Sequence, residues 1–449
     1  MSDGKALIGI DWGTHSSKWT WVLLGPDAGE VVGPYKILRS EICLDNDRQI
    51  FLSDEAPPSG SVYVSGVKGK LIDNPDGPFW VGPQRNIRLT LGELASFSFW
   101  SLLGQAYDNL CRNEMGRPEA LDVRFSLPNW VDTQKAVGRA CYEQAAKVAC
   151  HLFSSDREAW SEVPRPSVDE WQRKVRGALD FLALSDDSPI DDSRDGFRLM
   201  VNRVLDAGEG FSFRFVAESS AAGLAGLRRA SNADSGYLLK ILVIDVGAGS
   251  TDVGYVIRSV PPSGTEANEV LCQLPPANTC PIAGNNLSRR IVEIYQSRGI
   301  DIGMDEAERR KIGGEDNAWQ THPAVTDWIR SISEHVRAYV LGIPDARWLP
   351  EMPGLLMLVT GGSGVVPGLR EDILSGVAQG LRERRIPASV IDATKPMNLA
   401  LTGPAAKDAN RLAVALGAAS EDLPMLSYHK KLDPPMLHSS VRMPRSWTG

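Results

Sequence analysis

Two stretches of the chain share one pattern of apolar and polar positions. Residues 8–24 (IGIDWGTHSSKWTWVLL) and 242–258 (LVIDVGAGSTDVGYVIR) each run from an apolar strand into Asp-x-Gly, a small polar turn and a second strand with alternating side chains. When the two are superimposed, Asp11 coincides with Asp245. The pattern predicts an internal duplication, in which one α/β domain is used twice with a cleft between the copies.

The other segments alternate between helix and strand, as an α/β sheet requires. Apolar spacing predicts helices over 93–115, 132–150, 285–299, 324–341 and 409–419, a strand over 121–128, and a strand, glycine turn and helix over 355–376. Together these elements predict a first lobe at 1–240 with a subdomain at about 39–113, a second lobe at 241–397 with a subdomain at about 284–349, a return helix to the first lobe at 398–420, and a proline-rich basic tail at 421–449. No further folded domain is expected in the tail, because it has no repeating strand pattern.

Residues 151–212 interrupt this alternation, and we interpret them as a helical insertion with a mobile tip. Four apolar side chains fall on one face of its helix: Trp171, Val175, Leu179 and Leu182. This face must be buried either on the first lobe or on another protein. The segment 185–196 (SDDSPIDDSRDG) is acidic and has no core to enter, so it is expected to meet solvent or a basic partner.

Composition and charge exclude several classes of protein. With 43% apolar and 23% charged residues, the chain reads as an ordinary soluble globular protein. Its 48 basic and 56 acidic side chains give a net charge of −8, which argues against nucleic acid as a partner. Its six cysteines form no Cys-x-x-Cys and its six histidines no His-Glu-x-x-His, so structural zinc and disulfides are disfavoured and a cytoplasmic location is expected. Neither a signal peptide nor a stretch of about 18 apolar residues is present, so no membrane association is expected.

The two Asp-x-Gly turns carry the first candidate chemistry. Neither matches a Walker loop (GxxxxGKS/T) or a Rossmann turn (GxGxxG), and β-forming residues follow each turn, so each is expected to close a hairpin. Such a turn can present consecutive backbone N–H groups to a phosphate, while Asp11 and Asp245 hold a hydrated magnesium ion. Four hydroxyl groups would add donors: Thr14, Ser16, Ser250 and Thr251. A plain hairpin is the simpler interpretation of one such turn, but two matched copies favour a phosphate site.

A third glycine turn completes the pattern. Residues 355–369 (LLMLVTGGSGVVPGL) form an apolar strand, then Gly361-Gly362-Ser363, then Pro367, where a helix can begin. Adjacent glycines at a strand end let a flat ligand such as a nucleoside lie against bare backbone. After two phosphate hairpins, this turn is interpreted as an adenosine site.

Four segments together resemble a known family. They are IGIDWGTHSSK (8–18), AESSAAGLAG (217–226), VIDVGAGSTD (243–252) and VTGGSGVVPGL (359–369). They are similar to the first phosphate, first connecting, second phosphate and adenosine motifs of the actin-like ATPase superfamily, and most of all to the nucleotide-binding domain of the seventy-kilodalton heat-shock (DnaK-type) chaperones. The resemblance implies an α/β fold with two duplicated ribonuclease-H-like lobes and an ATP cleft between them.

The resemblance also implies roles for individual residues. Asp11 and Asp245 fall on the carboxylates that organise magnesium and its waters, and Glu218 falls on the glutamate that helps to orient the attacking water. Thr14 and His15 stand where the family has two threonines that touch the phosphates. The other implied contacts to ATP or ADP are Gly13, Gly247, Gly249, Ser250, Thr251, Gly284, Gly361, Gly362 and Ser363.

Several positions depart from the family pattern. Arg88, in NIRLTLG (86–92), is the nearest match to the catalytic lysine, and its planar fork could slow or alter hydrolysis. Val365 replaces an arginine that stacks on adenine, and Ala283-Gly284-Asn285-Asn286 replaces an acidic Gly-Gly-Glu-Asp segment. The adenine-contacting helix is only loosely recognisable, with two candidates: Glu334 and Arg337. No peptide-binding domain or lid is expected after residue 420.

The expected function is a chaperone-like ATPase that binds and hydrolyses Mg-ATP and changes its lobe angle to regulate an unidentified partner protein. Water would attack the γ-phosphate in line, with charge held by magnesium, turn amides and Arg88. Three alternatives stay open: a filament-forming actin-like protein, a sugar or acyl kinase of the same superfamily, and a nucleotide sensor that does not hydrolyse ATP. The last is favoured by Arg88 and Val365.

Overall fold

The computed structural model of this 449-residue chain describes residues 5–25, 29–52, 61–73, 78–80, 88–115, 117–127, 136–156, 165–185, 210–230, 238–259, 270–273, 278–313, 319–343, 354–386, 389–393 and 405–420. The chain divides into two compact units. The first unit comprises Met1–Ala221 with Val414–Glu421, and the second unit comprises Ala222–Ala413. The lobe and subdomain boundaries expected from the sequence stay predictions.

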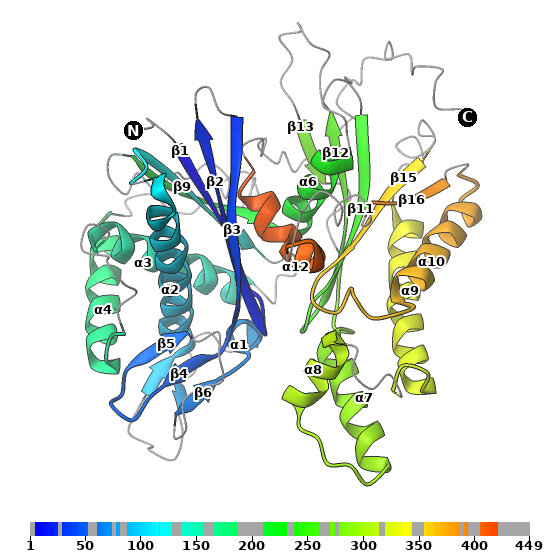
Figure 1. Ribbon diagram of the computed structural model, residues 1–449, viewed down its shortest axis with the longest axis horizontal. Helices are drawn as coiled ribbons and strands as arrows, with labels where there is room; N and C mark the ends of the chain where they lie inside the picture. The colour runs from blue at the N-terminus through cyan, green and yellow to red at the C-terminus, as the bar shows by residue number, and fades with distance from the viewer. Residues whose placement is uncertain are drawn as a thin grey trace, which may run out of the picture. The chain divides into compact units, whose positions relative to one another are not determined.

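A five-stranded sheet forms the centre of the first unit (Figure 1). Its strands, in spatial order, are β10 (Phe211–Ala217), β9 (Ala120–Leu127), β1 (Lys5–Asp11), β2 (Ser16–Gly25) and β3 (Gly29–Arg39). β1, β2 and β3 are antiparallel neighbours, whereas β9 and β10 run parallel to β1. After Lys5 every residue of β1 is buried, which is why its sequence is an almost continuous apolar run.

The sheet of the second unit repeats this topology. Its strands, in order, are β13 (Val270–Gln273), β12 (Thr251–Ser259), β11 (Leu238–Val246), β15 (Gly354–Thr360) and β16 (Ser389–Asp392), with β14 (Asn278–Cys280) paired to β12. β11 and β12 form an antiparallel hairpin, and β15 and β16 run parallel to β11. The same strand order and directions in both units confirm the predicted duplicated α/β fold. The cleft between the copies stays a prediction.

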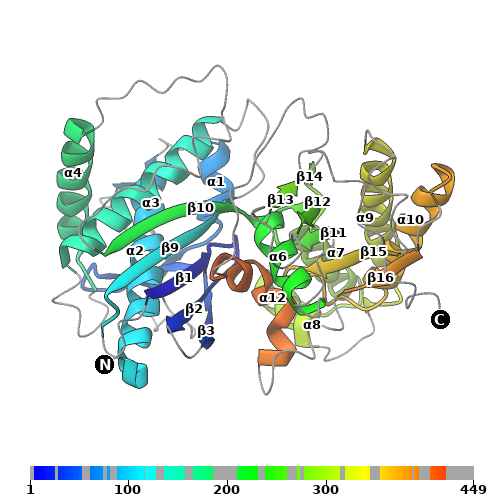
Figure 2. The same cartoon turned by 90° about the horizontal axis from the view of Figure 1, so that it is seen from above.

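Helices cover one face of the first sheet (Figures 1 and 2). They are α1 (Val67–Asp73), α2 (Leu91–Leu110), α3 (Ala136–Asp156) and α4 (Val168–Ser185). α2 begins with a capping box between Thr90 and Glu93 and continues into a π-helical turn at Cys111–Met115, so the helix predicted over 93–115 is confirmed. Its aromatic side chains, including Phe99 and Trp100, lie in the core of the unit with no exposed surface.

Smaller strands and helices complete the two units. The first unit has a three-stranded sheet of β4 (Ile42–Leu44), β5 (Ile50–Leu52) and β6 (Val62–Val64) and a two-stranded sheet of β7 (Pro78–Trp80) and β8 (Arg88–Thr90). The second unit has α7 (Gly284–Ser297), α8 (Met304–Gly313), α9 (Pro323–Gly342) and α10 (Leu369–Glu383). α9 and α10 lie side by side, and with α7 they enclose the core on one face of that sheet (Figure 1). α6 (Glu218–Ala230) and α12 (Ala405–Ala418) each begin in one unit and end in the other.

The opposite face of each central strand is covered closely by a helix. In the second unit, Gly226 of α6 leaves room for the side chains of Ile241 and Leu358. In the first unit, the end of α12 lies so near the sheet that a Cβ on Gly9 would collide with the carbonyl oxygen of Ala415. Small residues are therefore required at both contacts, because side chains would push helix and sheet apart.

The helix predicted within 151–212 is α4, and its apolar face is buried in the first unit. Trp171 has no exposed surface, and its indole N–H donates to the carbonyl of Glu93 at 2.9 Å. Val175 is buried as well, and Leu179 and Leu182 pack against the same core. Burial on the first lobe is thus the correct alternative for this helix, and a partner-facing apolar surface is wrong. The acidic segment lies outside the described residues from 186 to 196.

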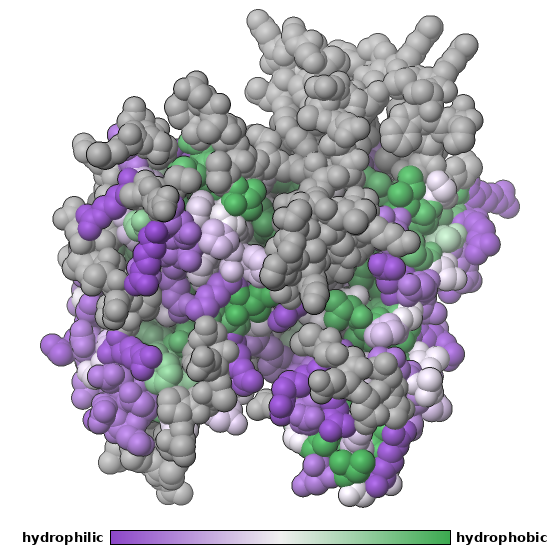
Figure 3. All heavy atoms as spheres, in the orientation of Figure 1, coloured by the Kyte–Doolittle hydropathy of each residue, from purple (hydrophilic) through white to green (hydrophobic). Residues whose placement is uncertain are grey.

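Polar side chains cover much of the outer surface on the face shown in Figure 3. Among the described residues, the large apolar side chains that are exposed are scattered over both units: Val32, Tyr63, Phe181, Ile300, Met304, Leu341 and Ile391. Single exposed apolar residues are normal for a folded protein. In the described part of the chain, no helix combines the length and the apolar character that a membrane crossing needs.

Candidate functional site

The first glycine turn, Gly13–Ser16, joins β1 to β2. A Cβ on Gly13 would collide with the carbonyl oxygen of Ser16, so this turn requires glycine. Trp12 does not face a ligand: it is buried against Phe99 and Tyr142, at ring-centroid distances of 4.9 and 5.5 Å. Trp12 is therefore a packing residue of the core. Thr14 and His15, at the tip of the turn, are partly exposed.

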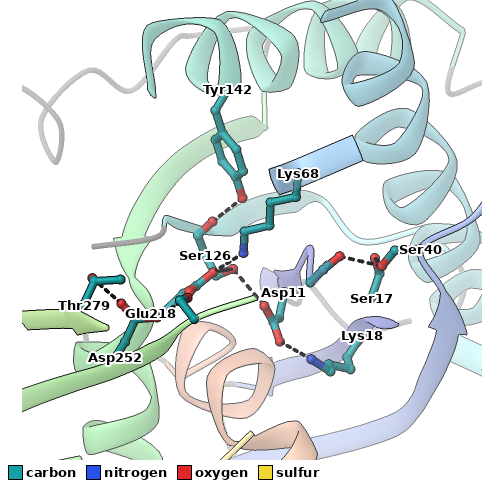
Figure 4. A network of polar contacts seen from close by, with 12 residues as sticks. Asp11, Ser17, Lys18, Ser40, Lys68, Ser126, Tyr142, Glu218, Asp252 and Thr279 are labelled. Atoms are coloured by element: carbon teal, nitrogen blue, oxygen red, sulfur yellow. Dashed lines mark hydrogen bonds and ion pairs between the residues drawn. The ribbon is translucent and has the colours of Figure 1, made fainter. Parts of the chain in front are cut away.

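Asp11 forms an ion pair across the base of this hairpin. Its Oδ2 lies 2.7 Å from Nζ of Lys18, and both side chains are buried (Figure 4). The two residues face each other in the register of β1 and β2, so the strand pairing itself sets this contact. Burial alone would raise the pKa of Asp11, but the charges of Lys18 and Lys68 and the hydrogen bonds from Lys18 and Ser126 outweigh it and hold the pKa below its usual value.

Asp11 and Glu218 meet at one hydroxyl group in the first unit. Oγ of Ser126, near the end of β9, lies 3.1 Å from Asp11 Oδ1 and 3.2 Å from Glu218 Oε1 (Figure 4). Glu218 is the first residue of α6 and is buried. Two residues assigned to catalysis from separate motifs therefore lie together in a buried polar cluster.

Lys68 adds a positive charge to this cluster. Its Nζ lies 2.7 Å from Oε1 of Glu218, with 11% of the Lys68 side chain and 8% of the Glu218 side chain exposed. Its charge also helps to lower the pKa of Asp11. Sequence reasoning did not select Lys68, because the motif match placed the catalytic cation at Arg88. The one available signal was a lysine after the glycine of Val-Ser-Gly-Val-Lys, at the start of a short helix before α2.

Tyr142 of α3 closes the cluster from the helical side. Its hydroxyl donates to the backbone carbonyl of Ser126 (Figure 4). Burial raises the pKa of Tyr142 well above its usual value, and the negative charges of Glu218 and Asp11 raise it further. The phenol therefore stays protonated and holds the strand segment that carries the Ser126 hydroxyl.

The second glycine turn, at 247–250, lies at the start of α7 in the second unit. The N–H groups of Gly284 and Asn285 donate to the carbonyls of Gly247 and Ala248 at 2.9 and 2.8 Å. Gly249 is exposed at the tip of the turn. The turn predicted from the sequence and the Gly284 segment are thus in direct contact.

The hydroxyl groups of this turn already have partners. Oγ1 of Thr251, which is buried, donates to the carbonyl of Ile282 at 2.7 Å. Oγ of Ser250 lies 2.9 Å from Oδ2 of Asp252, and the Thr279 hydroxyl also donates to that carboxylate. The Thr251 hydroxyl is therefore not free to donate to an anion, and the donors that remain in this turn are backbone N–H groups. The first unit has Lys18 at the hairpin position that Asp252 occupies here.

The third glycine turn, at 361–364, packs directly on the second. The N–H of Ser363 donates to the carbonyl of Val246 at 3.0 Å. Glycine is required at position 361 for two reasons: its φ is +87°, and a Cβ there would collide with Oδ1 of Asp245. A Cβ on Gly362 would meet no atom within 4 Å, which leaves open space beside the backbone at this position. The following helix begins at Leu369 after Gly368, two residues later than the predicted start at Pro367.

A buried cation lies behind Gly284 in the second unit. Nζ of Lys311 is 2.7 Å from Glu308 and 3.0 Å from Oγ of Ser288, and it donates to the carbonyl of Gly284. Burial lowers the pKa of Lys311, although the charge of Glu308 opposes the shift. A Cβ on Gly284 would meet Nζ of Lys311 at 2.9 Å and collide with the hydroxyl of Ser363.

Sequence reasoning missed Lys311 and Glu308. The two residues it named as candidates, Glu334 and Arg337, are not part of the polar group beside Gly284. Both missed residues lie on α8, which no motif marked. Glu334 is exposed on α9. Arg337 forms an ion pair with Glu383 of α10 at 2.6 Å. The assignment of Glu334 and Arg337 to adenine contact stays a prediction. Arg88 lies in β8, paired with Trp80, and its side chain lies outside the described part.

The carboxylates fit a magnesium ion held through water. Both oxygens of Asp11 accept a hydrogen bond, and a carboxylate has about four acceptor sites, so Asp11 keeps capacity for metal-bound water. Asp245, at the end of β11, is partly exposed. Magnesium ordinarily keeps several waters and takes one or two carboxylates. Among the described residues, no three His, Cys, Asp or Glu side chains converge as a protein-only metal cage.

Comparison with known proteins gives similarities of fold at low sequence identity. No family model matches the chain. No curated protein matches it. Among solved structures, the chain is similar to MreB5 of Spiroplasma citri bound to ADP, with 13% identity and a TM-score of 0.44 over 92% of this chain and 95% of that one. It is also similar to an archaeal actin homolog, with 14% identity and a TM-score of 0.45 over 92% of this chain and 98% of that one.

Proposed function

We propose that the chain is an ATPase that binds Mg-ATP with the glycine turns of both units and hydrolyses it with the polar cluster of the first. The observation that carries this proposal is the convergence of Asp11, Ser126, Glu218 and Lys68 in one buried cluster. Buried charged groups that are paired and hydrogen-bonded beside a glycine turn are typical of a site that handles a charged ligand.

Each residue of the cluster has a proposed task. Glu218 orients the attacking water, because its carboxylate is held in place by the ion pair with Lys68 and can accept a proton from that water. Lys68 stabilises the charge that develops on the transferring phosphoryl group, in place of Arg88. Asp11 holds water around the metal, and bound magnesium supplies charge neutralisation on the phosphate oxygens.

The glycine turns of the second unit are proposed to hold the rest of the nucleotide. The N–H groups of the turn at 247–250 bind phosphate, and the open space beside Gly362 accommodates the nucleoside. Lys311 and Glu308, beside the Gly284 carbonyl, complete this side of the site. Ser363 connects the two turns through its hydrogen bond to Val246.

Hydrolysis is tested by phosphate release from Mg-ATP with the full chain and with Glu218→Gln. The wild type is expected to turn over and the variant to bind ATP without hydrolysing it. If Glu218→Gln releases phosphate at the wild-type rate in a single turnover, Glu218 has no part in the reaction. If the wild type binds ATP and never hydrolyses it, the chain is a nucleotide sensor.

The output of the nucleotide cycle is proposed to be regulation of a partner protein. The DnaK-type branch of the resemblance rests on sequence motifs alone, and a filament-forming protein is the second candidate. Light scattering and sedimentation with ATP and with ADP separate the two. An ATP-dependent rise in scattering by the purified chain would replace the partner-regulating proposal with the filament, and its absence together with nucleotide-dependent recovery of a partner would support the first.

A further inference from the structure

Ser40 contacts the first glycine turn through two polar groups, its backbone N–H and its hydroxyl. It follows the last residue of β3 and is buried. Its backbone N–H donates to the carbonyl of His15 at 2.8 Å, and its Oγ lies 2.6 Å from the carbonyl oxygen of Gly13. Oγ of Ser17 lies 2.7 Å from the same hydroxyl (Figure 4). One serine thus holds two carbonyl groups of a short turn.

The direction of these hydrogen bonds follows from elementary chemistry. A carbonyl oxygen can only accept, so the hydroxyl of Ser40 donates to Gly13. A hydroxyl group has one proton, and that proton is used in this bond. Ser17 therefore donates to Oγ of Ser40 and fixes its rotamer. The Ser40 hydroxyl is satisfied as donor and as acceptor and has a single orientation.

The two hydrogen bonds that hold these carbonyls also fix the direction of the N–H groups that follow them in the turn. In a trans peptide the C=O and the following N–H point in opposite directions. Because Ser40 binds the carbonyls of Gly13 and His15, the N–H groups of Thr14 and Ser16 are turned to the side away from Ser40. Both residues are partly exposed.

The second unit also has two carbonyls of its turn held from one side, at other positions and by a different support. There the carbonyls of Gly247 and Ala248 are held by backbone N–H groups at the start of α7, which turns the N–H groups of Ala248 and Gly249 to the other side. The first unit has one side chain in place of a helix terminus. That side chain can be changed without altering the backbone.

We propose that Ser40 is a positioning residue for phosphate binding at the turn Gly13–Ser16: by holding two carbonyls from behind, it aims the N–H groups of Thr14 and Ser16 at a phosphate of the bound nucleotide. This inference rests on the proposed function. It predicts that the Ser40 hydroxyl matters for the phosphates of the ligand and not for its nucleoside.

The test uses a pair of substitutions with nearly the same shape. Ser40→Val and Ser40→Thr both add bulk at a buried position, but only Thr keeps the hydroxyl. Calorimetric titrations with adenosine, Mg-ADP and Mg-ATP are expected to show about tenfold weaker binding of both nucleotides to Ser40→Val and wild-type affinity for adenosine. Ser40→Thr should restore nucleotide affinity to within about threefold. Ser17→Ala, which leaves the bond to Gly13, should have a smaller effect than Ser40→Val.

Several results would overturn the inference. Unchanged ADP affinity in Ser40→Val does so, as does an equal loss of adenosine and ADP affinity, because that pattern indicates a general structural defect. If neither variant folds, hydrogen exchange of the wild type decides: Mg-ADP must slow exchange at Thr14 and Ser16 more than adenosine does, and equal protection contradicts the assignment. A folded wild type that binds no nucleotide refutes the proposed function itself, and the role of Ser40 with it.

Discussion

The ammonium group of Lys68 lies 2.7 Å from Oε1 of Glu218, although 150 positions separate the two residues in the chain. The contact brings a residue at the start of α1 to the first turn of α6, beside Asp11 and Ser126. Both side chains are almost fully buried, so this pair is shielded from solvent and its charges interact more strongly than a surface pair.

Lys68→Met should lower the rate of ATP hydrolysis by about 10²–10³, because one preorganised charge at the reacting group is lost. Arg88→Met is the matched control, because it removes the cation that the sequence motif had selected as the catalytic one. It should change the rate of ATP hydrolysis by less than about threefold. Steady-state phosphate release measures both. A larger loss in Arg88→Met than in Lys68→Met would return the catalytic cation to Arg88.

Glu218→Gln should lower the single-turnover rate of hydrolysis by about 10²–10⁴, the range for a group that handles a proton in the transition state. Binding of Mg-ATP should change little, because the carboxylate acts on the attacking water and not on the ground state. Quench-flow measurement of the rate, with calorimetric measurement of affinity, separates the two effects. Equal losses in affinity and rate would show that Glu218 binds the nucleotide.

Lys18→Met should lower the stability of the protein at neutral pH and make that stability less dependent on acid. In the wild type the pKa of Asp11 is below its ordinary value, so this carboxylate stabilises the fold above about pH 4 and the contribution is lost as pH falls through the folded-state pKa. Without Lys18 the pKa of Asp11 rises toward or above its ordinary value, so Asp11 no longer stabilises the fold at neutral pH and the loss of stability in acid becomes smaller or reverses. Removing one partner of a buried pair costs about 3 kcal/mol near neutral pH.

Urea unfolding at a series of pH values measures this change, with Lys70→Met as control. Lys70 is exposed, and its ammonium contacts the carbonyl of Ser65. We expect Lys18→Met, unlike Lys70→Met, to lower the free energy of unfolding at neutral pH and to lose less of it on acidification. Parallel pH profiles for Lys18→Met and the wild type would mean that Asp11 does not depend on Lys18.

Gly361→Ala and Gly362→Ala should separate stability from ligand binding. At Gly361 a Cβ collides with Asp245, and the φ of +87° is strained for alanine, so we expect a loss of about 2–4 kcal/mol in the free energy of unfolding. At Gly362 a Cβ meets no atom within 4 Å, so thermal unfolding should stay close to the wild type. Adenosine affinity should nevertheless fall in Gly362→Ala, because the methyl group fills the proposed nucleoside space. Wild-type adenosine binding by that variant would remove the nucleoside from this turn.

Local patterns predicted the two hairpins and most helices, and they could do so because strand alternation and glycine position are set by neighbouring residues. The register that opposes Asp11 to Lys18 follows from the same local pairing. The contact of Lys68 with Glu218 could not be predicted, because it depends on how distant segments pack. The surroundings of Glu334 and Arg337 also depend on packing: Glu334 is exposed and Arg337 pairs with Glu383 of α10.

The apolar face of α4 shows the limit of reading amphipathic patterns. The spacing of Trp171 and Val175 predicted a face that must be buried, and it is buried. The pattern does not say against what, because a core and a partner offer the same apolar environment. The hydrogen bond from Trp171 to Glu93 places this face on the helical layer of the first unit.

Calorimetric titration of the full wild-type chain with Mg-ATP and with Mg-ADP tests the central claim most directly. We expect saturable binding at one site per chain, and binding at least about tenfold weaker in Asp245→Asn at an unchanged melting temperature, because a carboxylate beside the glycine turns is neutralised without a change of shape. A folded wild type that binds neither nucleotide in the presence of magnesium would contradict it.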